Sequence, residues 1–317
     1  MPDEKTVLNV AVAVDASADV PLLAWFDLDD EWLTKARQIH DGLAKSAARA
    51  ETLPRGSVLQ RDDVVIGPPV PRPGKIVCIG LNYKDHAAES NMPVPKSPIT
   101  FSKYVTSVIG PDRPVRLPAV SQQVDYEAEM AIVIGRRAKH VPLERAFDHV
   151  LGYMNLNDVS ARDLQFADGQ WQRGKACDTF APMGPFILTR EAAGDPHALR
   201  IRCRVNGQTL QDSNTNQLVF GVDALVSFLS QTVTLEPGDV IATGTPPGVG
   251  FARKPPIFLK PGDVVEIEVE GLGVLSNPVI EDSRTHGPSC PWRNPQAVRA
   301  DDRARWGGVF AERGRSP

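Results

Sequence analysis

The chain has 317 residues, of which 42% are hydrophobic and 23% are charged. Its formal net charge of −4, without a long block of like charges in the main body, argues against nucleic acid or an anionic membrane as partner. We therefore expect a small-molecule substrate. No apolar run reaches the roughly 18 residues of a membrane span, and acidic residues stand at the N-terminus, so the sequence predicts a cytoplasmic protein. The 4 cysteines are far apart and form no CxxC pair, which predicts reduced thiols.

The first 72 residues predict a small accessory domain with strands and a helix. Residues 6–15 alternate as in a strand, and residues 24–28 favour another one. From Glu31 to Arg49, apolar side chains recur at steps of three and four residues, as they do on one face of a helix. The prolines and glycines between residues 65 and 74 then predict a linker, which ends this domain.

A His–Glu pair follows the first strand of the main domain. Residues 75–83 predict a buried strand, and Asp85 is the expected N-cap of a short helix. Because His86 and Glu89 are three residues apart, a helix would bring them side by side, and the carboxylate could orient the imidazole. A solvated surface pair is the alternative interpretation. Residues 97–104 predict another strand, which carries Lys103 near its end.

Two glutamates two residues apart stand in the segment DYEAEMAIVIG, residues 125–135. In a strand, Glu127 and Glu129 would share one face, and the other face would carry apolar residues from 128 to 134. Two carboxylates so close together are costly to bury unless they are protonated, paired or bound to a metal. A hard divalent cation would neutralise them, whereas an exposed edge strand would leave them in water.

Two further polar sites follow along the chain. A strand after residue 150 runs into Asp158, which could cap the helix ARDLQ or bind a metal. Residues 169–188 predict a loop that mixes glycine, proline and Lys175, a composition that often carries function. Residues 200–213 form a predicted hairpin, because Asn206-Gly207 is a strong type I′ turn signal. The many short strands predict an α+β fold that is mostly β.

After Asp282 the composition changes. Residues 283–317 contain 7 arginines and 4 prolines without apolar periodicity, which predicts a flexible C-terminal tail.

Five motifs together resemble the fumarylacetoacetate hydrolase family over about residues 75–282. They are GLNYKDHAAE (80–89), DYEAEMAIVIG (125–135), NDVSARDLQ (157–165), GKACDTFAPMGP (174–185) and TGTPPGVG (243–250). The resemblance implies a rolled mixed β-sheet core, a homodimer and a divalent ion, Mg²⁺ or Mn²⁺, held by Glu127, Glu129 and Asp158. The closest likeness is to members described as ureidoglycolate lyases or as hydrolases of 2,4-diketo-3-deoxy sugar acids.

Family membership also implies roles for other residues. His86 and Glu89 would form the catalytic dyad, with Lys175 beside the metal. The substrate-binding residues would be Lys103, Gln165 and Thr245. Leu81 departs from the pattern, since relatives that act on acylpyruvates often have arginine there.

The sequence thus predicts a hydrolase that cleaves a C–C bond in a 2,4-diketo acid. The metal would stabilise the enolate, while His86 and Glu89 activate a water. The alternative is a metal-dependent decarboxylase, lyase or isomerase of a related oxo acid, oxaloacetate-like or ureidoglycolate-like. A non-catalytic metal-binding or ligand-binding protein is a third interpretation.

Overall fold

The computed structural model describes residues 6–8, 38–39, 41–42, 45, 51–55 and 57–282. The chain divides between Ile66 and Gly67 into two units. In the first unit, β1 (Thr6–Leu8) pairs antiparallel with β2 (Val58–Gln60), η3 (Arg61–Asp63) follows, and the described residues between 38 and 45 are helical. The strand predicted at 24–28 and the tail from 283 to 317 lie outside the described residues.

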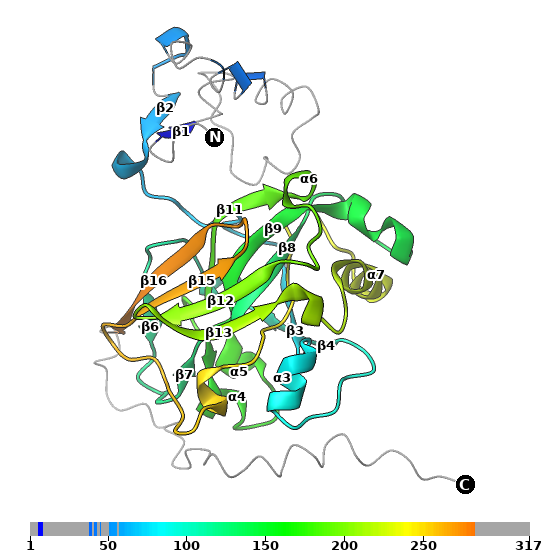
Figure 1. Ribbon diagram of the computed structural model, residues 1–317, viewed down its shortest axis with the longest axis vertical. Helices are drawn as coiled ribbons and strands as arrows, with labels where there is room; N and C mark the ends of the chain where they lie inside the picture. The colour runs from blue at the N-terminus through cyan, green and yellow to red at the C-terminus, as the bar shows by residue number, and fades with distance from the viewer. Residues whose placement is uncertain are drawn as a thin grey trace. The chain divides into compact units, whose positions relative to one another are not determined.

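Two mixed sheets build the second unit (Figure 1). The seven-stranded sheet contains, in spatial order, β4 (Ile99–Lys103), β3 (Ile76–Gly80), β14 (Val240–Ala242), β8 (Ala128–Ile134), β9 (Val150–Asn157), β11 (Ala181–Thr189) and β5 (Val108–Ile109). The five-stranded sheet contains β13 (Gln208–Asn214), β12 (Arg200–Val205), β15 (Val264–Val269), β16 (Val274–Glu281) and β6 (Val115–Leu117). A short pair joins β7 (Val124–Asp125) to β10 (Ser160–Ala161).

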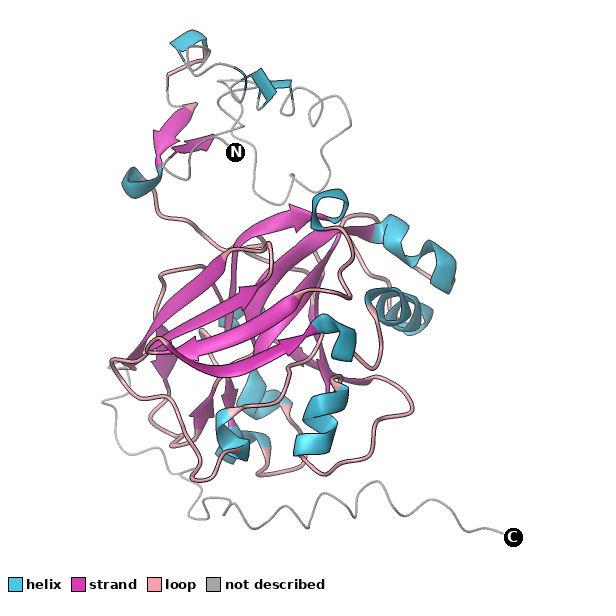
Figure 2. Ribbon diagram, viewed as in Figure 1, coloured by secondary structure: helices cyan, strands magenta, loops and turns pink. Residues whose placement is uncertain are grey.

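The sheets face each other, because β12 and β15 contact β8 while β15 and β16 contact β9. Apolar side chains from both sheets meet between them in one core, to which β8 contributes Met130, Ile132 and Ile134. Short helices surround the strands (Figure 2). The architecture confirms the predicted α+β class with a mixed, mostly β core. No helix among the described residues is long and apolar enough to cross a membrane.

The helical segments of this unit are short apart from α7. They are α3 (Lys84–Glu89), η4 (Val105–Ser107), η5 (Leu143–His149), α4 (Arg162–Gln165), α5 (Gln172–Lys175), α6 (Arg190–Ala193), η6 (Thr215–Gln217), α7 (Val222–Thr232) and η7 (Gly250–Ala252). The N-cap of α3 is Tyr83 and not the predicted Asp85, whose side chain instead accepts hydrogen bonds from the His86 N–H and the Ser213 hydroxyl. The predicted loop at 169–188 contains α5 and most of β11.

The predicted hairpin is present. β12 and β13 pair antiparallel, and Asn206 and Gly207 between them have φ angles of 53° and 77°. Two consecutive residues with positive φ define the type I′ turn, which matches the twist of the strands that it joins. The hairpin places β13, and with it Gln211, beside the elements that carry the polar site.

Candidate metal centre

Three carboxylates come together where β8 begins and β9 ends. Glu127 and Glu129 stand at the start of β8, and Asp158 directly follows β9. One carboxylate oxygen from each lies within 4.8 Å of the others, and all three residues are buried. The two strands are antiparallel neighbours, and the Asp158 N–H donates to the Glu127 carbonyl at 2.9 Å. Sheet pairing therefore fixes the spacing of these side chains.

Asp158 does not cap a helix in this arrangement. The residue before α4 is Ala161, and it has no side-chain cap. The Asp158 side chain instead forms ion pairs with two buried lysines, Lys103 Nζ at 2.7 Å and Lys175 Nζ at 2.9 Å. Of the two interpretations left open by the sequence, the cap is therefore excluded and the ligand role stays a prediction.

Lys175 bridges two of the carboxylates. Its Nζ lies 2.7 Å from Glu127 Oε2 as well as 2.9 Å from Asp158 Oδ2, and only 2% of its surface is exposed. Helix α5 brings it there by a close approach to α4, since a Cβ on Gly174 would lie 2.5 Å from the backbone oxygen of Ala161 and the backbone nitrogen of Gln165. Glycine at position 174 is therefore required for this placement of Lys175.

Glu129 has no such cation. Its Oε2 accepts a hydrogen bond from the Gly244 N–H at 2.9 Å, and within residues 57–282 no lysine or arginine forms an ion pair with it. Gly244 has a φ of 100°, and a Cβ there would come within 2.8 Å of Asn82 Cβ. This contact between strand β8 and the segment after β14 thus depends on a glycine.

The electrostatics of the glutamates differ accordingly. Burial, together with the negative charges of Asp158 and Glu127, raises the pKa of Glu129 well above its ordinary value. Burial also opposes ionisation of Glu127, but Lys175 and Arg162 outweigh it and lower the pKa of Glu127 to about 2. Glu129 is therefore the carboxylate of the three that has no ion-pair partner among the described residues.

This donor set fits a divalent ion. Three buried carboxylates supply hard oxygen ligands, which suit Mg²⁺ or Mn²⁺, and in residues 57–282 no lysine or arginine forms an ion pair with Glu129. Glu127, Glu129 and Asp158 would hold the ion.

The predicted dyad lies on α3. His86 Nδ1 is 3.1 Å from Glu89 Oε2, and the Gly248 N–H donates to the same carboxylate at 3.0 and 3.2 Å from its two oxygens. Positive charge on His86 contributes to lowering the pKa of Glu127, so the pair lies within electrostatic range of the carboxylates. Both side chains are partly exposed, which leaves them open to a substrate or water.

Comparison with known proteins identifies the family. Residues 75–280 match the family described as fumarylacetoacetate (FAA) hydrolase, C-terminal. The chain belongs to this family. The match confirms the resemblance found in the sequence, and the protein is an enzyme of the fumarylacetoacetate hydrolase family, whose members generally bind a divalent metal.

The chain is similar to two curated relatives and to one solved structure. Oxaloacetate tautomerase fahd2, mitochondrial, of Xenopus laevis is 54% identical over 225 residues, which cover 70% of this chain and 70% of that protein. Oxaloacetate tautomerase FAHD2A, mitochondrial, of Homo sapiens is 52% identical over 237 residues, 74% of this chain and 76% of that protein. The crystal structure of 2-hydroxyhepta-2,4-diene-1,7-dioate isomerase from Mycobacterium marinum has a TM-score of 0.64 and 42% identity, and covers 72% of this chain and 84% of that one.

The remaining site residues that the sequence predicts are buried in the structure. Gln165 Oε1 accepts a hydrogen bond from Arg162 Nη1 at 3.0 Å, and Thr245 Oγ1 accepts one from Gln211 Nε2 at 2.9 Å. Neither of these hydrogen bonds reaches the three carboxylates. The structure thus brings Lys103 and Lys175 into contact with the carboxylates, whereas Gln165 contacts Arg162 and Thr245 contacts Gln211.

Sequence reasoning missed Arg162 as part of this site. It is buried, and its guanidinium lies 2.7 Å from Glu127 Oε1 and 2.8 Å from Asp125 Oδ2. Asp125 in turn accepts hydrogen bonds from the N–H groups of Gly250 and Phe251. The sequence did contain a signal for this ion pair. The segment NDVSARDLQ carries an arginine, an aspartate stands two residues before Glu127, and both segments also carry predicted metal ligands.

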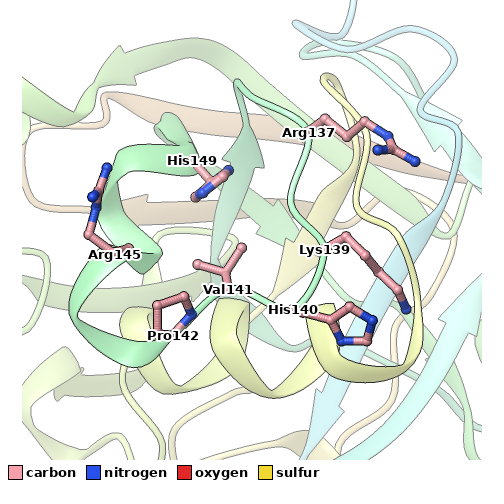
Figure 3. A pocket seen from close by; sticks show the side chains of 7 residues that line it. All are labelled: Arg137, Lys139, His140, Val141, Pro142, Arg145 and His149. Carbon is pink, nitrogen blue, oxygen red and sulfur yellow. The ribbon is translucent and has the colours of Figure 1, made fainter.

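A separate surface depression is lined by basic residues and contains none of the predicted site residues (Figure 3). Its lining residues are Arg137, Lys139, His140, Val141, Pro142, Arg145 and His149. Arg137 pairs with Glu236 and Arg145 pairs with Asp148, on exposed side chains. Exposed ion pairs of this kind contribute little to stability.

The raised pKa of Glu129 leads to a testable dependence on pH. In the ion-free protein its pKa exceeds that of an unfolded glutamate, so its contribution to stability is present at low pH and is lost as the pH rises through the raised pKa. A divalent cation binds the ionised carboxylate. The difference in Tm between protein with Mg²⁺ and protein with EDTA should therefore widen as the pH rises above the ordinary pKa of a glutamate, as measured by scanning calorimetry. A difference that narrows as the pH rises would contradict this assignment.

Proposed function

We propose that this protein catalyses the keto–enol interconversion of oxaloacetate or a closely related 2-oxo acid with a divalent metal. The observation that carries the proposal is the identity of more than half of the aligned residues to proteins named oxaloacetate tautomerases. The similar structure of 2-hydroxyhepta-2,4-diene-1,7-dioate isomerase, an enzyme named for an enol diacid, supports the same reaction class. These relatives favour the isomerase alternative over the hydrolysis that the sequence predicted.

The reaction is a net shift of one proton from carbon to oxygen, made in two transfers. The proton on C3 of the keto form is removed, the C–H electron pair becomes the C2–C3 double bond, and the keto oxygen receives a proton. When bound, the divalent ion supplies a Lewis acid for the carboxylate and keto oxygens of the substrate. Mg²⁺ or Mn²⁺ is the proposed ion, with Glu127, Glu129 and Asp158 as ligands.

His86 is the proposed proton carrier. Because Nδ1 faces the Glu89 carboxylate, that nitrogen carries the hydrogen in the neutral imidazole and Nε2 keeps a free lone pair. Nε2 can take the C3 proton and return it to the keto oxygen. Glu89 stabilises the imidazolium in between, and the Gly248 N–H holds Glu89 in place.

The two lysines have a supporting role. Lys103 and Lys175 pair with Asp158, and Lys175 also pairs with Glu127 and lowers the pKa of that carboxyl. Asp158 and Glu127 in turn raise the pKa of Lys175 despite its burial, so Lys175 stays cationic. The site thus holds fixed charges around a substrate that changes its own charge distribution.

A second candidate is the hydrolysis of a 2,4-diketo acid. The partial exposure of His86 and Glu89 favours it, because the same pair could deprotonate a water that attacks the distal carbonyl. A homodimer and a location in the cytoplasm, both expected from the sequence, stay predictions.

The products distinguish the candidates. Oxaloacetate enriched in its enol form is mixed with the Mg²⁺-loaded protein, and the loss of enol absorbance is followed while pyruvate is assayed. A panel of acylpyruvates is tested in parallel. Faster loss of enol without pyruvate supports the tautomerase, whereas cleavage of an acylpyruvate with no effect on the oxaloacetate enol would support the hydrolase instead.

A further inference from the structure

Gln211 connects three parts of the molecule by its side chain. It lies on β13 of the five-stranded sheet, and only 1% of its surface is exposed. Its Oε1 accepts a hydrogen bond from the Ala128 N–H at 2.9 Å, while its Nε2 donates to Thr245 Oγ1 at 2.9 Å and to the Pro246 carbonyl at 2.8 Å. A backbone N–H can only donate and a backbone carbonyl can only accept, so the orientation of this amide is determined.

The bond to Ala128 replaces a missing strand partner. Strand β14 pairs with β8 only from Ala131 to Val133, so it does not reach the beginning of β8. There, the Glu127 N–H donates to Asn157 Oδ1 at 3.0 Å and the Ala128 N–H donates to Gln211. Two side-chain amides thus accept hydrogen bonds from the backbone N–H groups on either side of the Glu127 carbonyl. The side chain of Glu127 is the first of the three carboxylates.

The bond to Thr245 determines what its hydroxyl can do. A threonine hydroxyl has one proton to donate and accepts through its lone pairs. Gln211 occupies an accepting position, and within the described residues the Thr245 hydroxyl donates to no protein acceptor. The preceding residue, Gly244, donates its N–H to Glu129. Thr245 therefore presents a hydroxyl proton one residue from the contact with a metal-centre carboxylate.

We propose that Gln211 is a positioning residue for substrate binding. It fixes the segment of Thr245 to the strand of the metal ligands, and it keeps the Thr245 hydroxyl as a donor toward a carboxylate of the 2-oxo acid. The inference rests on the proposed function for the identity of the substrate. It goes further by assigning the residue that orients the Thr245 hydroxyl.

A double-mutant cycle tests the proposal. Gln211→Met, Thr245→Val and the double variant are compared with the wild type in the Mg²⁺-loaded full chain. We expect each single variant to raise the KM for oxaloacetate by about 10- to 100-fold, the range for a hydrogen bond to a charged group, with a much smaller change in kcat. The double variant should lose little more than either single one, because both remove the same interaction.

Binding of oxalate gives a readout that does not depend on turnover. Calorimetry with this dicarboxylate should show the same loss of affinity and the same non-additivity. If the wild type binds oxalate with this coupling but does not interconvert oxaloacetate, the proposed function fails while the positioning role stands. Additive losses, or unchanged oxalate affinity in Gln211→Met, would overturn the positioning role.

Asn277→Leu is the matched control. Asn277 is also a buried amide, and its Nδ2 donates to the carbonyls of Gly110 and Arg113, away from the carboxylates. It should lower Tm without changing the KM or the oxalate affinity. Gln211→Glu keeps an acceptor for the Ala128 N–H and serves if Gln211→Met does not fold. An equal rise of KM in Asn277→Leu would reduce the role of Gln211 to general stability and so overturn the proposal.

Discussion

Glu129→Gln is expected to abolish activity and to weaken Mg²⁺ binding by more than about 100-fold, the upper range for residues that merely contact metal ligands. The substitution keeps the size of the side chain but removes the one carboxylate of the cluster that forms no ion pair with a lysine or arginine among the described residues. Glu127 and Asp158 already have Lys175, so the ion gains most from Glu129. Calorimetric titration with Mg²⁺ and the oxaloacetate assay measure the two effects.

Glu268→Gln provides the control for this variant. Glu266 and Glu268 are also two residues apart on one strand, β15 of the five-stranded sheet. They pair with Arg202 and Arg204 on the neighbouring strand β12. Removing one of these carboxylate charges should leave Mg²⁺ affinity and turnover close to wild type. If Glu129→Gln bound Mg²⁺ as tightly as Glu268→Gln, the ligand assignment would be wrong.

His86→Ala should slow the keto–enol interconversion by about 10²- to 10⁴-fold, the usual contribution of a positioned general base. The variant loses Nε2 as the proton carrier, whereas Glu127 and Asp158 keep their ion pairs with Lys103 and Lys175. Mg²⁺ affinity should therefore change little. Stopped-flow measurement of enol loss, together with Mg²⁺ titration, separates the loss of proton transfer from a loss of metal.

Two further variants sharpen this test. Glu89→Gln should have a smaller effect, because the imidazole stays in place but its charged form loses a carboxylate partner. His149→Ala removes a partly exposed histidine whose ring hydrogen-bonds to the Arg136 carbonyl, and it should behave as wild type. Full activity in His86→Ala would show that another group carries the proton.

The fold was predictable where a local pattern has one physical solution. The alternation of apolar and acidic residues around Glu127 and Glu129 indicated a strand with one core face, and Met130, Ile132 and Ile134 do face the core. The Asn206-Gly207 turn was equally clear, because two positive φ angles suit few other residue pairs. Such signals need no knowledge of distant parts of the chain.

Other features depend on contacts between distant segments. Asp85 has the chemistry of an N-cap, yet a bond with Ser213, 128 residues away, uses its side chain while the helix begins at Tyr83. Lys103 looks like a solvated charge in the sequence but is buried against Asp158. Gln211 carries no local signal at all, because its partners come from two other segments.

The placement of the carboxylates on neighbouring sheet strands also bears on which changes the site can tolerate. The ladder between β8 and β9 sets their spacing, whereas His86 and Glu89 belong to a short helix and Thr245 to a loop outside that ladder. We therefore expect exchanges in that helix or that loop to leave the spacing of the carboxylates unchanged.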